Sequence, residues 1–407
     1  MVKPTYFLPR KFTISDNYYK ALKEDYQKVI SEPEEHIKER YGIDVSSFYG
    51  PYKIKNPFGK ASGQLSTNAK QIKADIEGGL GFSVLKTVIA EGPDQVSEME
   101  AWKISAPRMV VEKITSKNGE EGYTVTWKGR GWEKSLKEYL EFMEEALSFC
   151  PNYPVIPSCK YHLPPLGTEY KIEEYAYTTQ KIYEVWKRQR KEELVLEKDF
   201  SATLAGEDAA GQKEQVLSWL LTVPQKIKES VEDPIYLGVK LMNTTLLDEF
   251  QREIVRELLG PKSNWLADYA VCFNRLFDPQ KEFDGKVGVA YGGYDLSDRN
   301  LWALEALVPE KPSRMISATG NICSGHIMLE YALRGASNGQ IHTFYQVPAS
   351  EYAPIEGTRI QRALHELLFN PEKGLVAGLI YIRERLNKAD EPFTFVEVTE
   401  LDPRKLL

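Results

Sequence analysis

Two lysines stand at the ends of short apolar runs, a position in which a charged side chain must find a partner. Lys86 follows Ser-Val-Leu and Lys240 follows Gly-Val. An ammonium group removed from water is costly unless an anion or a polar group meets it. A structural ion pair would satisfy either lysine alone, but the two together predict a site for an anionic ligand.

Small residues and glycines follow other apolar runs. The Ala61-Ser62-Gly63 turn would let a flat ring approach the backbone, although a tight turn alone also explains it. Gly320-Asn321 precedes an expected helix, and a later run ends in His342-Thr343. Glycine turns that lead into helix N-termini expose backbone N–H groups and a positive dipole end, so a phosphate is expected here; backbone geometry alone is the alternative.

The elements that must position these residues alternate along the chain. After residue 54, short apolar runs alternate with amphipathic stretches of helical period, which indicates β-α units and a parallel sheet. Eight strands and eight helices predict an α/β fold, a (β/α)8 TIM barrel. The strands are expected at 58–62, 83–89, 155–161, 194–199, 235–241, 269–273, 315–319 and 339–343. The helices are expected at 68–77, 134–149, 173–190, 214–230, 246–259, 300–307, 325–334 and 358–368.

The remaining segments are interpreted as additions to one barrel domain. Residues 1–50 predict an N-terminal extension with a helical run over 17–40, residues 51–370 the barrel itself, and residues 371–407 a C-terminal helix and tail packed on it. Asn118-Gly119 between two β-rich runs, 108–115 and 123–128, predicts an inserted β-hairpin over one mouth of the barrel. The glycine-containing stretch 277–298 predicts a long loop after the sixth strand.

Composition excludes several classes of function. The 407 residues carry 52 Lys and Arg against 59 Asp and Glu, a formal net charge of -7. Without a block of positive charge we expect no nucleic-acid binding, and without a long apolar run no membrane span. No signal-peptide core follows Met1, which predicts a cytoplasmic protein. Four scattered cysteines predict reduced thiols, and we expect no metal site from the two distant Cys-x-x-His pairs.

Taken in order, these motifs resemble the FMN-binding barrel of dihydroorotate dehydrogenases and the related dihydropyrimidine dehydrogenases. The resemblance runs over roughly residues 50–345 and is carried by the segments 56–63, 79–88, 238–241, 316–324 and 335–343. It implies an FMN cofactor. The residues that it implies for FMN binding are Ala61, Ser62, Gly63, Lys86, Thr87, Lys240, Asn274, Gly292, Gly293, Gly320, Asn321, His342 and Thr343.

The resemblance also implies a position for each part of the cofactor. The isoalloxazine would rest on the turn at 61–63, with Lys86 and Thr87 near its pyrimidine edge and Lys240 near the ring and the ribityl chain. The phosphate would lie on the turns at 320–321 and 342–343, beside the glycine pair at 292–293. A lysine beside the pyrimidine half would stabilise the negative charge of a reduced flavin.

The sequence departs from the family where the family binds its substrate. The family's fourth strand ends in an Asn-x-Ser-Cys/Ser-Pro-Asn loop, whose Cys or Ser takes the substrate proton. The matching stretch here is 197–204, with Ala202 at the base position. Asp199, Ser201 and Thr203 are the neighbouring candidates, and Asp199 could accept a proton if burial raised its pKa. Further strand-end candidates for a substrate, each with an ion-paired or solvated role as the alternative, are Lys60, Tyr161, His162 and Arg275.

We therefore expect an FMN-dependent oxidoreductase that exchanges a hydride between flavin N5 and a small substrate, acting on CH–CH or related bonds. The missing base argues against dihydroorotate as the substrate, and the catalytic candidates are Lys86, Asp199 and Ser201. Two alternatives stay open: a non-catalytic barrel that binds FMN or another phosphate ligand, alone or in a larger redox complex, and a dihydroorotate dehydrogenase with a rebuilt substrate loop. The resemblance implies a homo-oligomer and an electron-transfer partner subunit.

Overall fold

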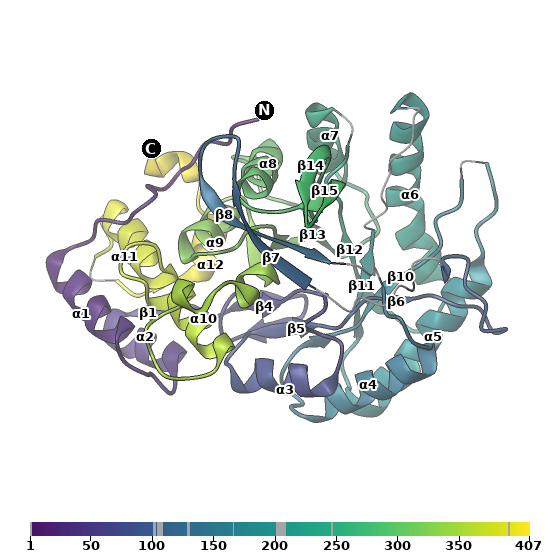
Figure 1. Ribbon diagram of the computed structural model, residues 1–407, viewed down its shortest axis with the longest axis horizontal. Helices are drawn as coiled ribbons and strands as arrows, with labels where there is room; N and C mark the ends of the chain where they lie inside the picture. Colours follow the sequence, from purple (N-terminus) through teal and green to yellow (C-terminus); the bar gives the residue numbers. More distant parts are fainter. Residues whose placement is uncertain are drawn as a thin grey trace.

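The computed structural model describes residues 2–100, 103, 109–127, 131–165, 167–200, 209–245, 247–389 and 391–407. Its centre is one curled sheet of parallel strands in the order β6-β10-β11-β12-β13-β16-β17-β4-β5-β9 (Figure 1). The prediction of a barrel-like α/β architecture is thereby confirmed. The strands are β4 (Phe58–Lys60), β5 (Phe82–Val84), β6 (Val88–Ile89), β9 (Val155–Ile156), β10 (Ser158–Lys160), β11 (Leu194–Asp199), β12 (Ile235–Lys240), β13 (Tyr269–Cys272), β16 (Met315–Thr319) and β17 (Ala336–Ile341).

Helices cover the outer face of this sheet (Figure 1). Each amphipathic stretch expected from the sequence overlaps one, although the helix expected at 300–307 begins six residues earlier, at Tyr294. Side-chain caps fix several of the helix starts. The Asn68 side chain accepts from the Gln71 backbone, and Ser135 and Thr358 form capping boxes. The helices are α3 (Ala69–Glu77), α4 (Leu136–Ser148), α5 (Ile172–Gln189), α6 (Ala209–Glu229), α7 (Asp248–Leu259), α8 (Tyr294–Leu304), α9 (Gly325–Ala332) and α10 (Arg359–Phe369).

The two faces of the sheet carry different residues. Leu194 and Leu196 of β11 belong to the main core shared with the helices, whereas Val195 belongs to a separate apolar cluster. Because side chains alternate along a strand, Glu197 and Asp199 share the face of Val195. The inner face is therefore apolar near the start of β11 and charged near its end.

A short hairpin fills the inner face at the N-terminal ends of the strands. It consists of β2 (Ser47–Tyr49) and β3 (Tyr52–Ile54), whose residues Tyr49 and Ile54 join the cluster of Val195. The Asn338 side chain of β17 donates to the Phe48 carbonyl at 2.7 Å, which fixes the hairpin to the sheet. The sequence predicts that the N-terminal extension ends and the barrel begins at residue 50, and this position lies in the turn of the hairpin.

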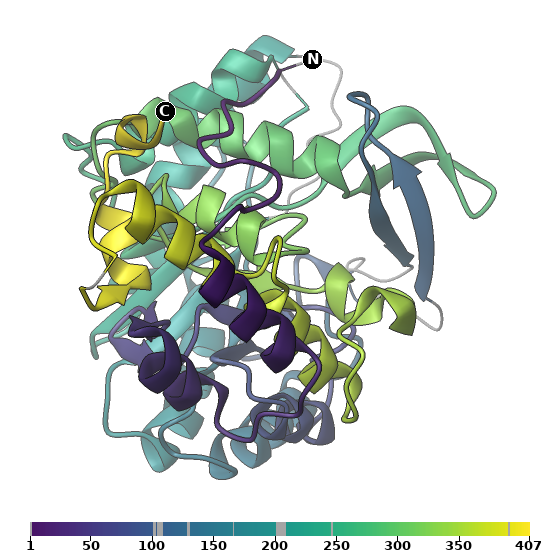
Figure 2. The same cartoon turned by 90° about the vertical axis from the view of Figure 1, so that its left-hand side faces the viewer.

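The N-terminal and C-terminal segments lie side by side outside the sheet (Figure 2). The helical run expected over 17–40 is two helices, α1 (Asp16–Tyr26) and α2 (Pro33–Tyr41), because Pro33 lacks an N–H and starts a new helix. The α1 helix contacts α10 and α11 (Leu375–Arg385). Strand β1 (Ile43–Asp44) pairs in parallel with β18 (Phe393–Thr394), just before α12 (Phe395–Glu400), so the C-terminal tail is tied to the extension.

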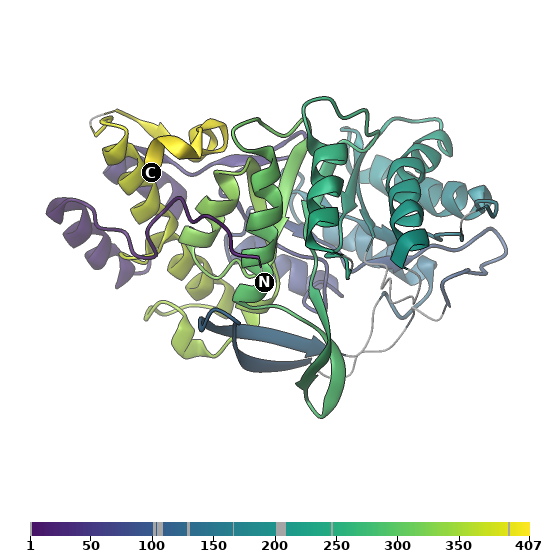
Figure 3. The ribbon, with the colours of Figure 1, turned by 90° about the horizontal axis from the view of Figure 1, so that it is seen from above.

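Two further hairpins extend together from one end of the sheet (Figure 3). The predicted hairpin is present as β7 (Met109–Thr115) and β8 (Glu121–Trp127). The prediction of a long loop over 277–298 is wrong. The stretch contains the paired strands β14 (Leu276–Phe283) and β15 (Lys286–Tyr291) and the start of α8. Asp284-Gly285, with positive φ at both residues, makes the turn. Strand β15 contacts β8, so the hairpins support each other.

None of the described helices is both long and apolar enough to cross a lipid bilayer.

Candidate functional site

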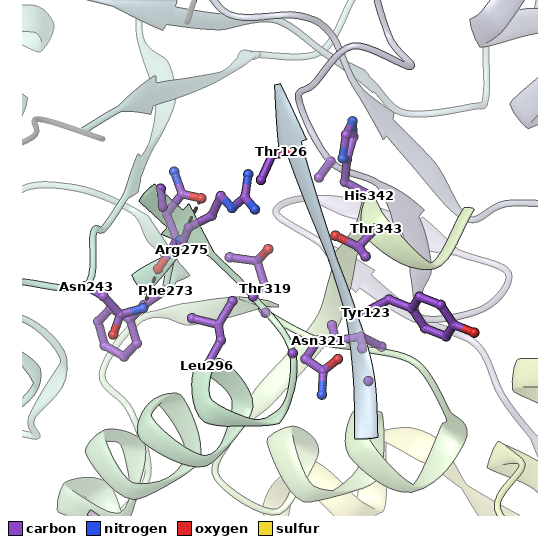
Figure 4. A pocket seen from close by; sticks show the side chains of 18 of the residues that line it. Tyr123, Thr126, Asn243, Phe273, Arg275, Leu296, Thr319, Asn321, His342 and Thr343 are labelled. Carbon is purple, nitrogen blue, oxygen red and sulfur yellow. Dashed lines mark hydrogen bonds between the residues drawn. The ribbon is translucent and has the colours of Figure 1, made fainter. Parts of the chain in front are cut away.

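A cavity of about 980 Å³ opens at the C-terminal ends of the strands, under the two hairpins. Asp199, Lys240, Thr319 and Ile341, which end β11, β12, β16 and β17, all line it. In the view of Figure 4, strand β8 crosses the cavity between Arg275 and His342. This end of a parallel sheet is where barrel enzymes hold their ligands, and the volume lies at the upper end of the range for small-molecule sites.

The cavity brings together most of the residues singled out from the sequence. Gly63 lies beside the lining, where a Cβ would come within 2.4 Å of the His342 ring. Ser201 lies outside the described residues, as do Ala202 and Thr203. The predicted residues that line the cavity are Ala61, Ser62, Lys86, Thr87, Asp199, Lys240, Asn274, Gly292, Gly293, Gly320, Asn321, His342 and Thr343.

Lys86 is buried at the cavity wall, with 5% of its surface exposed. Its backbone N–H donates to the Ser66 carbonyl at 2.8 Å, which fixes the segment between β5 and β6. Burial lowers the pKa of Lys86 to about 8, Asp199 acts against this shift, and Lys240 adds to it. The lysine is therefore charged at neutral pH in a place where its positive charge is poorly solvated, which favours an anion beside it.

Lys240 has an internal partner. Its Nζ lies 3.7 Å from Oε1 of Glu197, a carboxyl with no exposed surface. Burial raises the pKa of Glu197, while Lys240 and the Gln340 hydrogen bond lower it. The structural ion pair that the sequence left open is thus present at Lys240, in addition to its place on the cavity wall.

Asp199 presents a carboxylate to the same cavity. Its Oδ2 lies 3.7 Å from Nζ of Lys160 and accepts a hydrogen bond of 3.5 Å from Oγ1 of Thr87. Strand β11 brings Asp199 and Glu197 to one face, two residues apart. Asp199 therefore meets the positional requirement of a cavity base, while its catalytic role stays a prediction.

Glycines shape the opposite wall. Gly320 has φ +115°, and a Cβ there would come within 2.4 Å of Asn300 Nδ2. That Asn300 amide donates to the Thr319 carbonyl at 2.8 Å and holds the turn against α8. Gly293, with φ +70°, caps α8 without a side chain, so the positive end of this helix faces the cavity.

The first hairpin occupies part of this wall. Oγ1 of Thr124, a buried residue of β8, accepts hydrogen bonds of 3.0 Å from both the Gly292 N–H and Arg275 Nη2. One N–H of the expected phosphate cradle is therefore already engaged by the hairpin. Thr124 was missed by sequence reasoning, because nothing in the hairpin pattern shows which strand residue reaches the barrel.

The strand-end candidates separate into two groups. Arg275 lines the cavity, and burial lowers its pKa to about 9. Lys60 instead pairs with Asp75 at 2.6 Å between the sheet and α3, and Tyr161 bonds to Thr179 of α5 at 2.7 Å. His162 is half-buried and lies outside the lining, with its backbone N–H donating to Glu174. These last three have structural partners.

Glu197 and Gln340, two buried polar residues at the cavity, were also missed. Glu197 accepts a hydrogen bond of 2.7 Å from Gln340 Nε2, across the inner face of the sheet. A glutamate inside the apolar run Leu-Val-Leu-Glu was a signal that could have found it. His342 is buried too, and the surrounding cations add to burial in lowering its pKa, so the imidazole is neutral at neutral pH.

The donor set fits a phosphorylated ring compound such as FMN. One wall carries Lys86, Lys240 and Arg275, whose positive charges match an anionic ring edge or a phosphate. The other wall offers a helix N-terminus and the Gly320 turn, whose close approach to Asn300 leaves no room for a Cβ. The arrangement could hold a flavin and orient a second small molecule against it.

No protein-family model matches the chain, and no curated protein resembles it significantly in sequence. The family resemblance read from the motifs therefore remains a prediction, and the residues of the cavity are what supports a function.

Proposed function

We propose that the protein is an FMN-dependent oxidoreductase of dihydroorotate dehydrogenase-like type that acts on a small substrate other than dihydroorotate. The single observation that carries the proposal is the convergence of Lys86, Lys240 and the Gly320-Asn321 turn on one cavity from strands far apart in the sequence. As expected from the sequence, we also propose that the substrate is a small molecule, that a separate partner accepts the electrons, and that the protein is cytoplasmic.

The proposal includes a closed barrel of eight strands. Strands β5 and β6 are separated by three residues, and β9 and β10 by Pro157 alone, which lacks the N–H of a continuous ladder. Strand β5 pairs with β9, and β6 pairs with β10. If β5 and β6 are two parts of one strand, and β9 and β10 two parts of a second strand, then the first and last strands of the sheet are paired and the sheet closes. The pairings therefore support a ring of eight.

When bound, FMN would supply a hydride acceptor and donor at its ring. We assign Lys86 to the ring edge that becomes negative, and Lys240 to the ring and the ribityl chain. The phosphate is assigned to the backbone at Gly320 and to the start of α8. Asp199 would orient the substrate or take its proton at Oδ2, and the two hairpins would exclude water from the cavity.

The test is an absorbance spectrum of the purified protein, followed by heat release and mass identification of any chromophore. Flavin bands with one FMN released per chain are expected. The FMN-loaded protein mixed anaerobically with dihydroorotate should keep its flavin oxidised, and bleaching would restore dihydroorotate as the substrate. A colourless protein that takes up no added FMN would overturn the proposal and favour a different phosphate ligand.

A further inference from the structure

A chain of hydroxyl groups runs from the cavity to the buried Glu197. Ser62 Oγ, which lines the cavity, lies 2.8 Å from Thr87 Oγ1, and Thr87 Oγ1 lies 3.0 Å from Ser158 Oγ. Ser158 Oγ in turn donates to Glu197 Oε1 at 3.3 Å. We call Ser62, Thr87 and Ser158 the hydroxyl chain; each comes from a different strand or strand end.

The chemistry of the last acceptor fixes the direction of these bonds. A carboxylate has no hydrogen to give, so Ser158 must donate to Glu197. Each hydroxyl carries one hydrogen, so Ser158, which gives its own to Glu197, accepts from Thr87. Thr87 lies 3.0 Å from Ser158 and 3.5 Å from the Asp199 carboxylate, so its hydrogen points to the nearer Ser158, and Thr87 accepts from Ser62. All three hydrogens point from the cavity toward Glu197, which is the arrangement required to pass a proton inward.

Glu197 sits in surroundings suited to hold that proton. Its side chain has no exposed surface, and burial raises the pKa of its carboxyl. Gln340 holds the other oxygen, Oε2, at 2.7 Å, leaving Oε1 facing Ser158. The titratable groups that face it from the surrounding elements are Lys240 of β12, Asp199 of β11, Tyr49 of β2, Tyr269 of β13 and Tyr139 of α4.

We propose that Glu197 is the proton acceptor of the cavity, reached through Ser62, Thr87 and Ser158, which leaves Asp199 the role of orienting the substrate. This inference rests on the proposed oxidoreductase function and supplies the acid-base group that Ala202 cannot. A proton released by the substrate binds Ser62 Oγ, whose own hydrogen moves to Thr87; Thr87 passes its hydrogen to Ser158, and Ser158 to Glu197 Oε1. The carboxylate becomes a carboxylic acid, and each hydroxyl is restored. The electron pair of the broken C–H bond would form the substrate's new double bond, and the hydride from the neighbouring carbon would go to the flavin of the proposed function.

The first measurement needs no flavin. The flavin-free protein is labelled with carboxyl-13C glutamate, and the Glu197 signal is assigned by its loss in Glu197→Gln. The Glu197 signal should titrate above the ordinary glutamate pKa of about 4.3. A titration at or below that value would overturn the role, because the carboxyl would then release a proton too readily to store it.

The second measurement separates proton storage from proton transfer. FMN-loaded protein is photoreduced in weakly buffered dye solution, and the protons taken up per two electrons are counted. Glu197→Gln, which keeps the shape and the Gln340 contact, should take up fewer protons than the wild type. Ser158→Ala, which breaks the chain and keeps the carboxyl, should take up the same number roughly 10²-fold more slowly.

The matched control is Ser317→Ala, which removes another fully buried strand hydroxyl, bonded to Asn338 and separate from the hydroxyl chain. It should change neither the number nor the rate. Equal uptake in Glu197→Gln and wild type, or equal rates in Ser158→Ala and Ser317→Ala, would overturn the inference. Failure to bind FMN, seen in the spectrum before photoreduction, would instead count against the proposed function.

Discussion

At the scale of single residues, Lys86 is a cavity residue whose charge conflicts with its burial. Its ammonium is desolvated, and Lys240 and Lys160 add positive charge nearby. Such a group gains most from a ligand whose own negative charge increases during the reaction. Lys86 therefore has its largest effect in the reduced state of the proposed flavin.

Replacing Lys86 by Met should make the bound flavin harder to reduce. Loss of one charged contact corresponds to about 30 to 60 mV in a two-electron midpoint potential. Because the pKa of Lys86 is about 8, the wild-type lysine is charged below pH 8 and loses its charge above it. The wild-type potential should thus fall more steeply above pH 8, and Lys86→Met should lack this change in slope.

The control is Lys286→Met, which removes an exposed lysine of the same cavity lining. Spectroelectrochemical titration of both variants across pH gives the comparison. Equal potentials in Lys86→Met and Lys286→Met would show that Lys86 has no special role toward the flavin.

Single site residues could be predicted from the sequence only where the residue and its immediate neighbours in the chain form a recognisable pattern. Lys86 and Lys240 could be found because each ends an apolar run in the sequence. Thr124 and Ser158 could not, because their importance comes from partners on other elements, Gly292 and Glu197. No local pattern reports a contact that tertiary packing creates.

At the scale of elements, the two hairpins form one unit with the cavity wall. Thr124 joins them, because its hydroxyl oxygen accepts from Arg275 before β14 and from Gly292 after β15. A single buried oxygen thus anchors the base of both hairpins.

Replacing Thr124 by Val should loosen both hairpins. The change keeps the shape but leaves the buried Gly292 N–H without its acceptor, at a cost of about 1 to 3 kcal/mol. The midpoint of urea unfolding should fall, and cleavage by a protease within 109–127 or 276–291 should become faster. Thr126→Val is the control, since Thr126 is half-buried and donates to Glu112 at 3.4 Å. Identical cleavage of the two variants would contradict the anchoring role.

The elements themselves were largely predictable. Both ends of β11 and β16 agree with the sequence pattern, because a buried parallel strand reads as an unbroken apolar run. The hairpin of β7 and β8 followed from Asn118-Gly119. The hairpin of β14 and β15 did not, because Pro279 and several charged residues interrupt the alternation that marks a strand.

At the scale of the whole molecule, the N-terminal segment is held by a buried ion pair. Arg334, just after α9, lies 2.8 Å from Glu330 and 2.9 Å from Glu305, and its guanidinium also donates to the Thr5 carbonyl. Glu330 accepts from the Leu8 backbone N–H at 2.8 Å. The first residues of the chain are thereby tied to helices formed more than 300 residues later.

Replacing Arg334 by Met should destabilise the protein by about 3 to 5 kcal/mol, because it leaves the Glu330 carboxyl buried without its cation. Urea unfolding followed by tryptophan fluorescence measures the loss. The control is Arg404→Met, which breaks an exposed pair with Asp402 and should leave the unfolding midpoint unchanged. Similar midpoints for both variants would show that the buried pair adds no stability.

The first strand of the sheet, β4, pairs on one side with β17, the last of its strands in the chain. The hairpin of β2 and β3 depends on the same late segment, since Phe48 bonds to Asn338, 290 residues further along. On the ribosome, therefore, β4 leaves the exit tunnel long before its partner exists. The nascent chain must carry an unpaired strand edge through most of its synthesis, which makes protection from aggregation a requirement of how this protein is made.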